Sequence, residues 1–463
     1  MKYINETKIN GLLEAAKKAR PFDIGAILEK SRKLKRLNLA ETAALLAADD
    51  PESIKKIFAA ASYVKDTIYG RRVVLFAPLY ISNICANNCL YCAFKSDNTM
   101  TKRRALSARE IKEQTEWLLN RGHKRILMVA GEAAPSGMAN VDYYVEAVRA
   151  IYSAGVGQHR IKRVNVNCAP LSTEEFKKLK ASGIGTYQLF QETYHEATYR
   201  NVHIKGPKSD PDNRIDAVDR AFLAGIDDIG IGALYGLYDW KFETLAMLMH
   251  IEHMESRFNV GPHTISVPRI EPALGVSFTE DMPYALSDNE FKRLVAVLRL
   301  SVPYTGIILS TRESPDMRDA LFSLGVSQIS AESRTSPGGY SSDDNNRNHD
   351  IQFTIGDQRS LDEVIGSLIK QKFIPSFCAA CYRKERTGKA FMKLAKPGTI
   401  KGKCSMNALI TLKEYLDDFA SAAVKQEGYA LINKLKGTLD PADREILAKF
   451  FRGIDKGKRD EFV

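Results

Sequence analysis

Two patterns of apolar and polar residues divide the chain. Over residues 1–65 apolar positions recur every three or four residues, which predicts amphipathic helices. From residue 71 onward, short β-branched runs alternate with longer amphipathic stretches, several of which begin at Ser, Thr or Asp and end at Gly. The short runs predict strands over residues 71–82, 125–132, 163–169, 186–193, 227–236, 264–272, 306–313 and 327–335.

Eight strands that alternate with helices predict the α/β class, in the form of a parallel (β/α)8 TIM-type barrel. We expect an N-terminal helical extension over residues 1–65, the barrel over 66–358 and a mainly helical C-terminal domain over 359–463. The polar, glycine-containing segment 336–359 predicts a long loop. One miscounted strand would instead give a partial barrel or an open sheet.

The predicted barrel also indicates where chemistry would occur, because active sites in such barrels lie at the carboxyl ends of the strands. Polar and thiol side chains are found at those ends. They are Glu132, Asn165, Asn167, Cys168, Glu192, Thr193, Tyr194, Arg269, Glu271, Thr311, Arg312, Glu313, Ser333 and Arg334.

Three cysteines follow the first predicted strand. Cys85, Cys89 and Cys92 have C-x3-C-x2-C spacing, which lets one loop place several soft thiolates around a single centre. A structural zinc ion needs four ligands, and a 4Fe–4S cluster has four irons to satisfy. Three thiols would leave one iron open to a ligand from outside the protein. The alternatives are a zinc site with a remote fourth ligand, or three unrelated buried cysteines.

A second group of three cysteines lies near the C-terminus. Cys378 and Cys381 form C-x2-C, and Cys404 follows after 22 intervening residues. The one other cysteine, Cys168, lies on a predicted barrel strand. Two groups of three soft ligands favour two iron–sulfur clusters, so the C-terminal domain is expected to hold the second. A zinc knuckle completed by a distant His is the alternative.

Composition restricts the cellular setting. Seven cysteines are an odd number, and the N-terminus lacks an apolar signal segment, so we expect a reducing, cytoplasmic location. No apolar run approaches the ~20 residues of a membrane span. The net charge of +11 raises the possibility of a nucleic-acid partner, but basic and acidic residues are mixed and no recognition module is present. We therefore expect no nucleic acid, with an acidic protein partner as a second possibility.

Several motifs together resemble one enzyme family. They are NICANNCLYCAF at 83–94, AGE at 130–132, FQETYHEATY at 190–199, LSTRES at 309–314 and ESRTSPGGY at 332–340. From about residue 65 onward the chain resembles the aromatic-amino-acid lyase branch of the radical S-adenosylmethionine (SAM) enzymes. The C-terminal C-x2-C-x22-C spacing is similar to that of tyrosine lyases that serve di-iron hydrogenase maturation, and separates the chain from the thiamine-pathway tyrosine lyases.

The resemblance implies roles for residues near the first triad. Cys85, Cys89 and Cys92 would hold a 4Fe–4S cluster whose free iron binds the amino and carboxylate groups of SAM. Gly131 and Glu132 would contact the SAM amino group, with Ala130 where the family often has a further glycine. Three further residues complete the implied set: Tyr91 would shield the cluster, and Glu192 and Tyr194 would contact the SAM ribose or the substrate.

The resemblance also implies a substrate clamp and a second metal site. Arg334 is the preferred ligand for the tyrosine carboxylate, with Arg269 and Arg312 as possible supports, because a guanidinium fork suits a carboxylate. Cys378, Cys381 and Cys404 would hold an auxiliary iron–sulfur cluster. His263 would contribute to an additional iron beside it.

The implied activity is cleavage of the Cα–Cβ bond of L-tyrosine to p-cresol and dehydroglycine. The fragment would then yield CO and cyanide at the auxiliary cluster, for assembly of the hydrogenase active site. Implied partners are SAM, L-tyrosine, an electron donor and hydrogenase maturation scaffold proteins. Two alternatives remain open: a tyrosine or tryptophan lyase that feeds another pathway such as thiamine thiazole synthesis, and a non-catalytic iron–sulfur scaffold.

Overall fold

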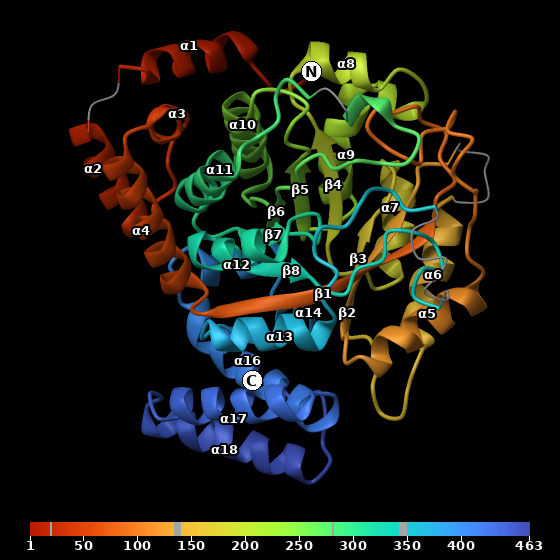
Figure 1. Cartoon of the computed structure of the whole chain (residues 1–463), viewed down its shortest axis with the longest axis vertical. Coiled ribbons are helices and arrows are strands. Elements are labelled where there is room, and N and C mark those ends of the chain that lie inside the picture. Colours follow the sequence, from red (N-terminus) through yellow and green to blue (C-terminus); the bar gives the residue numbers. More distant parts are fainter. Residues whose placement is uncertain (19–20, 134–139, 280–281, 342–349) are drawn as a thin grey trace.

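A closed barrel of parallel strands forms the centre of the molecule in the computed structural model, which describes residues 1–18, 21–133, 140–279, 282–341 and 350–463 (Figure 1). Strand β1 pairs with both β2 and β8, and this closes the ring. The ring consists of β1 (Arg72–Ser82), β2 (Arg125–Ala130), β3 (Arg163–Asn167), β4 (Tyr187–Glu192), β5 (Ile229–Ala233), β6 (Thr264–Ser266), β7 (Gly306–Leu309) and β8 (Gln328–Ser330).

Helices surround this ring and extend it at both ends of the chain (Figure 1). The N-terminal group is α1 (Glu6–Ala16), α2 (Pro21–Arg32), α3 (Leu39–Ala47) and α4 (Pro51–Ile68). The barrel helices are α5 (Ala108–Asn120), α6 (Val141–Ser153), α7 (Thr173–Ala181), α8 (Glu196–Val202), α9 (Pro211–Leu223), α10 (Trp240–Phe258), α11 (Asp288–Ser301) and α12 (Pro315–Leu324), with short 3-10 turns at Pro207–Ser209 and Ser277–Thr279. The C-terminal group is α13 (Leu361–Lys370), α14 (Ala380–Arg383), α15 (Gly388–Ala395), α16 (Ile400–Asp418), α17 (Ala422–Lys436) and α18 (Pro441–Asp455).

The predicted fold class is confirmed. Each observed barrel strand begins within two residues of its predicted start, because the β-branched runs mark the buried parts of the strands. All of the barrel strands except β1 end earlier than predicted, most clearly β6, which stops at Ser266 before Val267 and Pro268. The residues beyond each end are outside the regular ladder at the mouth of the barrel, although Tyr235 and Arg269 still form an isolated parallel bridge there.

One strand was not predicted. Strand β9 (Ile374–Ser376) lies parallel to the first residues of β1, with Arg72 opposite Ile374 and Val74 opposite Ser376. Three residues that include Pro375 give no alternating pattern, and proline is tolerated here because the strand is at an edge. Strand β9 places Cys378 just beyond the amino-terminal end of the barrel strands, and α16 packs on it with Cys404.

The interior of the barrel follows the two-residue period of its strands. Alternate residues of β1 point into the bore: Arg72 and Val74 line a lower cavity, while Phe76, Pro78 and Tyr80 line an upper one. Strand β2 repeats the pattern, with Arg125 below and Leu127 and Val129 above. The same strands therefore connect two cavities at opposite ends of one bore.

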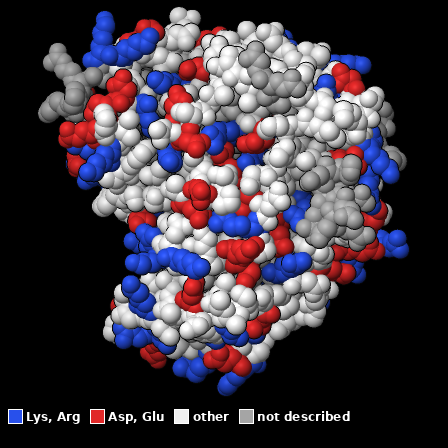
Figure 2. All heavy atoms as spheres, viewed as in Figure 1, with Lys and Arg blue, Asp and Glu red and all other residues white. Residues whose placement is uncertain are grey.

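The surface agrees with the mixed charge of the sequence. Figure 2 shows Lys and Arg side chains interspersed with Asp and Glu over the visible face, without a continuous basic band. Within the described part of the chain, no helix combines the length and apolar composition that crossing a bilayer requires.

Candidate active site

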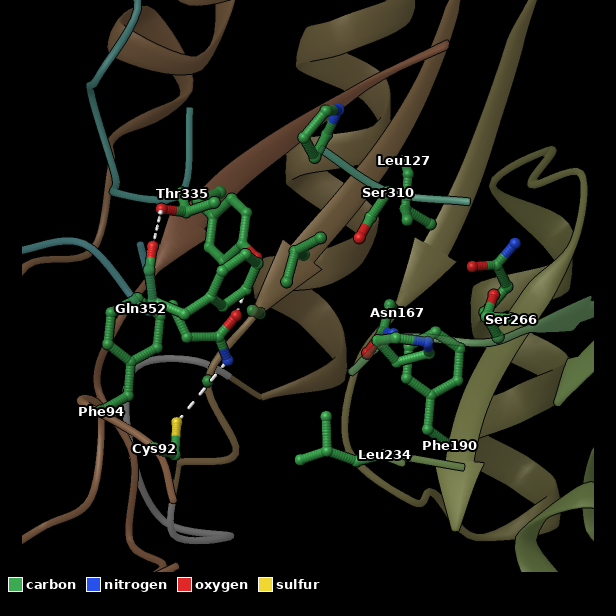
Figure 3. A pocket seen from close by; sticks show the side chains of 18 of the residues that line it. Cys92, Phe94, Leu127, Asn167, Phe190, Leu234, Ser266, Ser310, Thr335 and Gln352 are labelled. Carbon is green, nitrogen blue, oxygen red and sulfur yellow. Dashed lines mark hydrogen bonds between the residues drawn. The ribbon is translucent and has the colours of Figure 1, made fainter. Parts of the chain in front are cut away.

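The upper cavity lies at the carboxyl ends of the barrel strands and has a volume of about 210 Å3. All three thiols of the first triad line it, and so does Cys168. Figure 3 shows Cys92 and Phe94 on one side of this cavity and Phe190, Asn167 and Ser266 on the other. The remaining walls are mainly apolar and include Tyr80, Leu234 and Phe353, so a bound molecule would be largely shielded from water.

Backbone hydrogen bonds fix the loop that carries the triad. The Asn88 and Leu90 N–H groups donate to the carbonyls of Lys205 (2.9 Å) and Val202 (3.0 Å). The predicted shielding residue Tyr91 is buried, and its hydroxyl lies 2.8 Å from Nε2 of His203. The thiols are thus held in place by neighbouring backbone, and no described cysteine is in a disulfide.

The triad fits an iron–sulfur cluster by its donor set. The pKa of the Cys89 thiol is raised to about 12, mainly by burial, with a contribution from the neighbouring Cys92 and Cys85 and against the opposing effect of the Lys208 cation. Burial also raises the pKa of the Cys92 thiol, and such buried thiols would become thiolates when a metal supplies the missing positive charge. Gln352 Nε2 lies 3.7 Å from the Cys92 sulfur and would donate to it (Figure 3). Among the described residues, no three His, Cys, Asp or Glu side chains converge on a point that suits a single metal ion.

The glycine–glutamate segment after β2 is packed against this loop. Gly131 N donates to the Ser82 carbonyl at 2.9 Å, and Ala86 N donates to the Glu132 carbonyl at 2.8 Å. A Cβ at Gly131 would lie 2.5 Å from the carbonyl oxygen of Ile84, so the backbone approaches too closely for any other residue. Both residues line the cavity, and their contact with the amino group of SAM stays a prediction.

An ionic network lies beside the predicted acidic residues. Lys208 Nζ is 2.7 Å from Glu192, while Arg214 lies 3.4 Å from Glu192 and 3.7 Å from Glu132. Burial alone would raise the pKa of Glu192, but Lys208 and Arg214 outweigh it and hold that pKa below its ordinary value. Glu192 also has a left-handed backbone (φ 72°), a strained conformation of the kind found at functional sites.

Tyr194 does not line the upper cavity. It is fully buried behind the end of β4, and its hydroxyl lies 3.1 Å from Nδ1 of His250. Its backbone N–H donates to Glu243 at 2.8 Å, and Thr193 donates its hydroxyl to the same carboxyl group. The structure therefore gives Tyr194 contacts that support the backbone next to Glu192.

Glu243 gives this support a pH dependence. Burial raises its pKa to about 8, although the two hydrogen bonds from Thr193 and Tyr194 lower it. A carboxyl group whose folded-state pKa is raised stabilises the fold at low pH, and that stability is lost as the pH rises from about 4.5 through about 8. We expect the melting temperature of the unaltered protein to fall between pH 6 and pH 9. Glu243→Gln, which keeps an acceptor but cannot ionise, should show a smaller fall; parallel melting profiles would contradict this.

The structure separates the three candidate arginines. Arg312 lines the upper cavity, 3.4 Å above the Phe353 ring, and no described carboxylate is within ion-pair distance of it. Arg269 is paired with Glu313 and Asp288 and does not line the cavity. Arg334 does not line it either, and Nη1 of Arg334 donates to the Ser333 carbonyl at 3.1 Å. Of the three, Arg312 alone has its guanidinium at the cavity.

The second cysteine group lies at the lower end of the bore. Cys378, Cys381 and Cys404 line a cavity of about 40 Å3 together with His263. Ala380 N donates to the Cys378 sulfur at 3.4 Å, a contact that suits a thiolate. The residues thus fit a second cluster with one imidazole at its edge.

His263 is held as a neutral ring in this cavity. Burial lowers its pKa to about 4, and nearby Asp228, with Oδ1 3.7 Å from Nδ1 of the ring, opposes that shift. The Nδ1 atom has no hydrogen-bond partner among the described residues, and the ring packs on Phe391 at 4.4 Å between centroids. A neutral imidazole is the form that binds a metal.

Several charged residues that line the two cavities were not predicted from the sequence. Both Lys208 and Arg214 lie beyond β4. Lys208 is in the short 3-10 turn Pro207–Ser209 and Arg214 is in the first turn of α9, and only the apolar neighbours of Arg214 in the helical pattern could have indicated its burial. The cavity arginines Arg72, Arg125 and Arg163 each begin a barrel strand. An arginine at the start of three successive strands is a pattern in the sequence that could have indicated this cavity.

Comparison with known proteins places this geometry in a family. The model of the radical SAM superfamily matches residues 79–250, and that of the biotin and thiamin synthesis associated domain matches residues 266–374. The chain is 32% identical to 2-iminoacetate synthase of Salmonella typhimurium over 76% of this chain and 89% of that protein. The chain is therefore a radical SAM enzyme.

Solved structures narrow the assignment. A crystal structure of HydG, described as a maturase of the FeFe-hydrogenase, matches all of both chains with 46% identity and a TM-score of 0.96. HydG from Carboxydothermus hydrogenoformans matches 96% of this chain and 98% of that one, with 41% identity and a TM-score of 0.83. The chain belongs to the HydG-type maturases of the radical SAM superfamily, which are related to the 2-iminoacetate synthases.

Proposed function

We propose that this chain is a tyrosine lyase that cleaves the Cα–Cβ bond of L-tyrosine to p-cresol and dehydroglycine. It would then convert the fragment to CO and cyanide for assembly of the FeFe-hydrogenase active site. One observation carries the proposal: two groups of three thiols line two cavities at opposite ends of one barrel bore. The full-length similarity to HydG supports it.

The upper cavity would bind the cofactors and tyrosine. The thiols of Cys85, Cys89 and Cys92 would hold a 4Fe–4S cluster. With SAM bound, that cluster would supply the one-electron reduction of SAM that produces a hydrogen-abstracting radical. Glu132 and the Gly131 backbone would orient the ammonium group of SAM through short charge-assisted hydrogen bonds. The apolar walls exclude water from the reacting atoms.

Arg312 would hold the carboxylate of tyrosine. Its guanidinium has no described carboxylate partner in a mainly apolar cavity, so a bound carboxylate would provide one. The sequence favoured Arg334 as the residue that binds the carboxylate. We now propose Arg312, which follows a neighbouring strand.

Arg312→Lys should raise KM for tyrosine by about 10–100-fold, because lysine keeps the charge but loses the two-pronged hydrogen bond. Steady-state formation of p-cresol measures the change. Arg334→Lys is the matched control and should alter KM by less than about threefold. A larger increase in KM for Arg334→Lys than for Arg312→Lys would show that Arg334 is the residue that binds the carboxylate.

The fragment would pass along the bore to the lower cavity, where Cys378, Cys381, Cys404 and His263 would hold the auxiliary cluster and an additional iron. The alternating residues of β1 and β2 that line both cavities support this route. Partner scaffold proteins of hydrogenase maturation would receive the product.

The test is turnover by anaerobically reconstituted protein with SAM, L-tyrosine and a strong reductant. We expect 5′-deoxyadenosine and p-cresol in equal amounts, followed by CO and cyanide. Absence of p-cresol would refute the tyrosine-lyase assignment.

The similarity to 2-iminoacetate synthase favours a second candidate, a lyase that makes dehydroglycine for thiamine thiazole synthesis. Both candidates predict p-cresol. Free dehydroglycine, detected as its hydrolysis product glyoxylate without CO or cyanide, would favour the second.

A further inference from the structure

A polar layer crosses the barrel beneath the upper cavity. Gln188 on β4 lies opposite Gly230 on β5, and Gly230 lies opposite Thr264 on β6, so the three residues occupy one level of the sheet. A Cβ at Gly230 would lie 2.7 Å from both Cγ of Gln188 and the hydroxyl oxygen of Thr264. The two side chains therefore meet over the glycine, inside the bore. Barrel interiors are ordinarily filled by bulky branched apolar residues, so this layer departs from the usual packing.

Both polar side chains of the layer lack a hydrogen-bond partner. Gln188 and Thr264 are each 2% exposed, and neither Oε1 of Gln188 nor Oγ1 of Thr264 has a partner among the described residues. On the adjacent strand β3 a buried amide is satisfied, because Asn165 Oδ1 accepts from Arg163 Nε at 2.8 Å and from the Thr186 N–H at 3.0 Å. Leaving buried polar groups unpaired is costly, so two of them side by side indicate a bound group that pairs with them.

The layer forms the floor of the upper cavity. Gln188 itself lines that cavity, and so do Phe190 and Ser266, the next inward-pointing residues of the same two strands (Figure 3). Arg312 is at the other end of the cavity, because it follows β7, whose Gly306 lies at the level of the polar layer. A molecule held at both ends of this cavity would have an anionic group at Arg312 and a hydrogen-bonding group at the floor.

We propose that Gln188 and Thr264 bind the phenol hydroxyl of L-tyrosine and so determine which aromatic amino acid the enzyme accepts. The carboxylate would lie at Arg312 and the ring between the apolar walls of the cavity. The phenol O–H would donate to Oε1 of Gln188, and the Thr264 hydroxyl would donate to the phenol oxygen. The inference rests on the proposed function, because it takes tyrosine to be the substrate.

The hydroxyl group is a stronger basis for selection than the size of the ring. An extra apolar contact changes affinity little, whereas a site built around a hydrogen bond disfavours an analogue that cannot form it, because the buried polar groups then stay unpaired. Phenylalanine is such an analogue, since it has the carboxylate and the ring but no hydroxyl. The same argument predicts that ligand-free Gln188→Leu, which lacks the unpaired amide, melts no lower than the unaltered protein.

Binding of L-tyrosine and L-phenylalanine provides the test. The full chain is reconstituted anaerobically with iron and sulfide, loaded with SAM and kept without reductant, so that isothermal titration calorimetry measures Kd without turnover. Gln188→Leu and Thr264→Val are compared with Gln328→Leu. This matched control replaces the same type of side chain in the same bore, but at the lower cavity.

We expect the unaltered protein to bind tyrosine at least about 100-fold more tightly than phenylalanine. Gln188→Leu should weaken tyrosine binding by about 10–100-fold and change phenylalanine binding by less than about threefold, with a smaller loss in the same direction for Thr264→Val. Gln328→Leu should leave both Kd values within about threefold. An unchanged ratio of the two Kd values in both Gln188→Leu and Thr264→Val would overturn the inference.

The same variants separate failure of this inference from failure of the proposed function. If tyrosine does not bind to unaltered protein that has an intact first cluster and bound SAM, the proposed function itself is refuted. If Gln188→Leu binds both amino acids normally and forms p-cresol at the usual rate but loses CO, the polar layer serves the fragment in the bore, and this inference alone is overturned. If Gln188→Leu does not fold, the ratio measured with Thr264→Val decides the outcome.

Discussion

Replacing Cys85, Cys89 and Cys92 together with alanine is expected to reduce p-cresol formation by at least about a thousandfold, which is ~4 kcal/mol of activation free energy. The three thiols line the upper cavity and would be the soft ligands of a cluster, so their replacement would remove the metal that activates SAM. The measurement is single-turnover formation of p-cresol and 5′-deoxyadenosine.

Cys168→Ala is the matched control for the first triad. This thiol is buried and lines the same cavity, but it lies just beyond β3 and outside the loop that carries the triad. We expect it to retain most of the activity and the iron content of the first cluster. Loss of activity with Cys168→Ala equal to that of the triple variant would show that the assignment of the ligand set is wrong.

Replacing Cys378 and Cys381 with alanine should separate the two halves of the reaction. The upper cavity is unchanged by these substitutions, so p-cresol should form at a rate within about threefold of the unaltered protein. CO and cyanide should fall to background, because the lower cavity would no longer hold its metal. Headspace CO and trapped cyanide, measured beside p-cresol in one reaction, give both results.

A normal yield of CO from that double variant would show that the second cysteine group has no part in the later steps. A loss of p-cresol in protein with an intact first cluster would show that the two ends of the bore are coupled. Iron content of the first site, measured in the same preparation, distinguishes coupling from misfolding.

The barrel was predictable from the sequence because each strand contains a buried β-branched run. Strands that are buried on both faces have such near-continuous apolar sequences. Strand β9 was not predictable, because three residues that include Pro375 acquire their conformation from pairing with Arg72–Val74. The same strand places the second cysteine group under the barrel, a position that spacing alone could not give.

The candidate metal ligands were easier to predict than the candidate substrate-binding residues. Cysteine spacing is a local property, so the three thiols of each group were found from the sequence, and the structure brings each group to one cavity. Arg269, Arg312 and Arg334 all follow strands, and their side chains differ only in direction and partner. Glu313 pairs with Arg269, while Arg312 extends over Phe353, and such choices depend on packing between distant segments.

The central claim is that the first thiol group leaves one iron free to bind SAM. The direct test is the electron paramagnetic resonance (EPR) spectrum of the reduced protein with Cys378, Cys381 and Cys404 replaced by alanine, recorded with and without SAM. We predict a 4Fe–4S signal whose g values change when SAM is added, because the cofactor becomes a ligand of the cluster. A spectrum that SAM leaves unchanged, or protein that contains only zinc, would contradict the account.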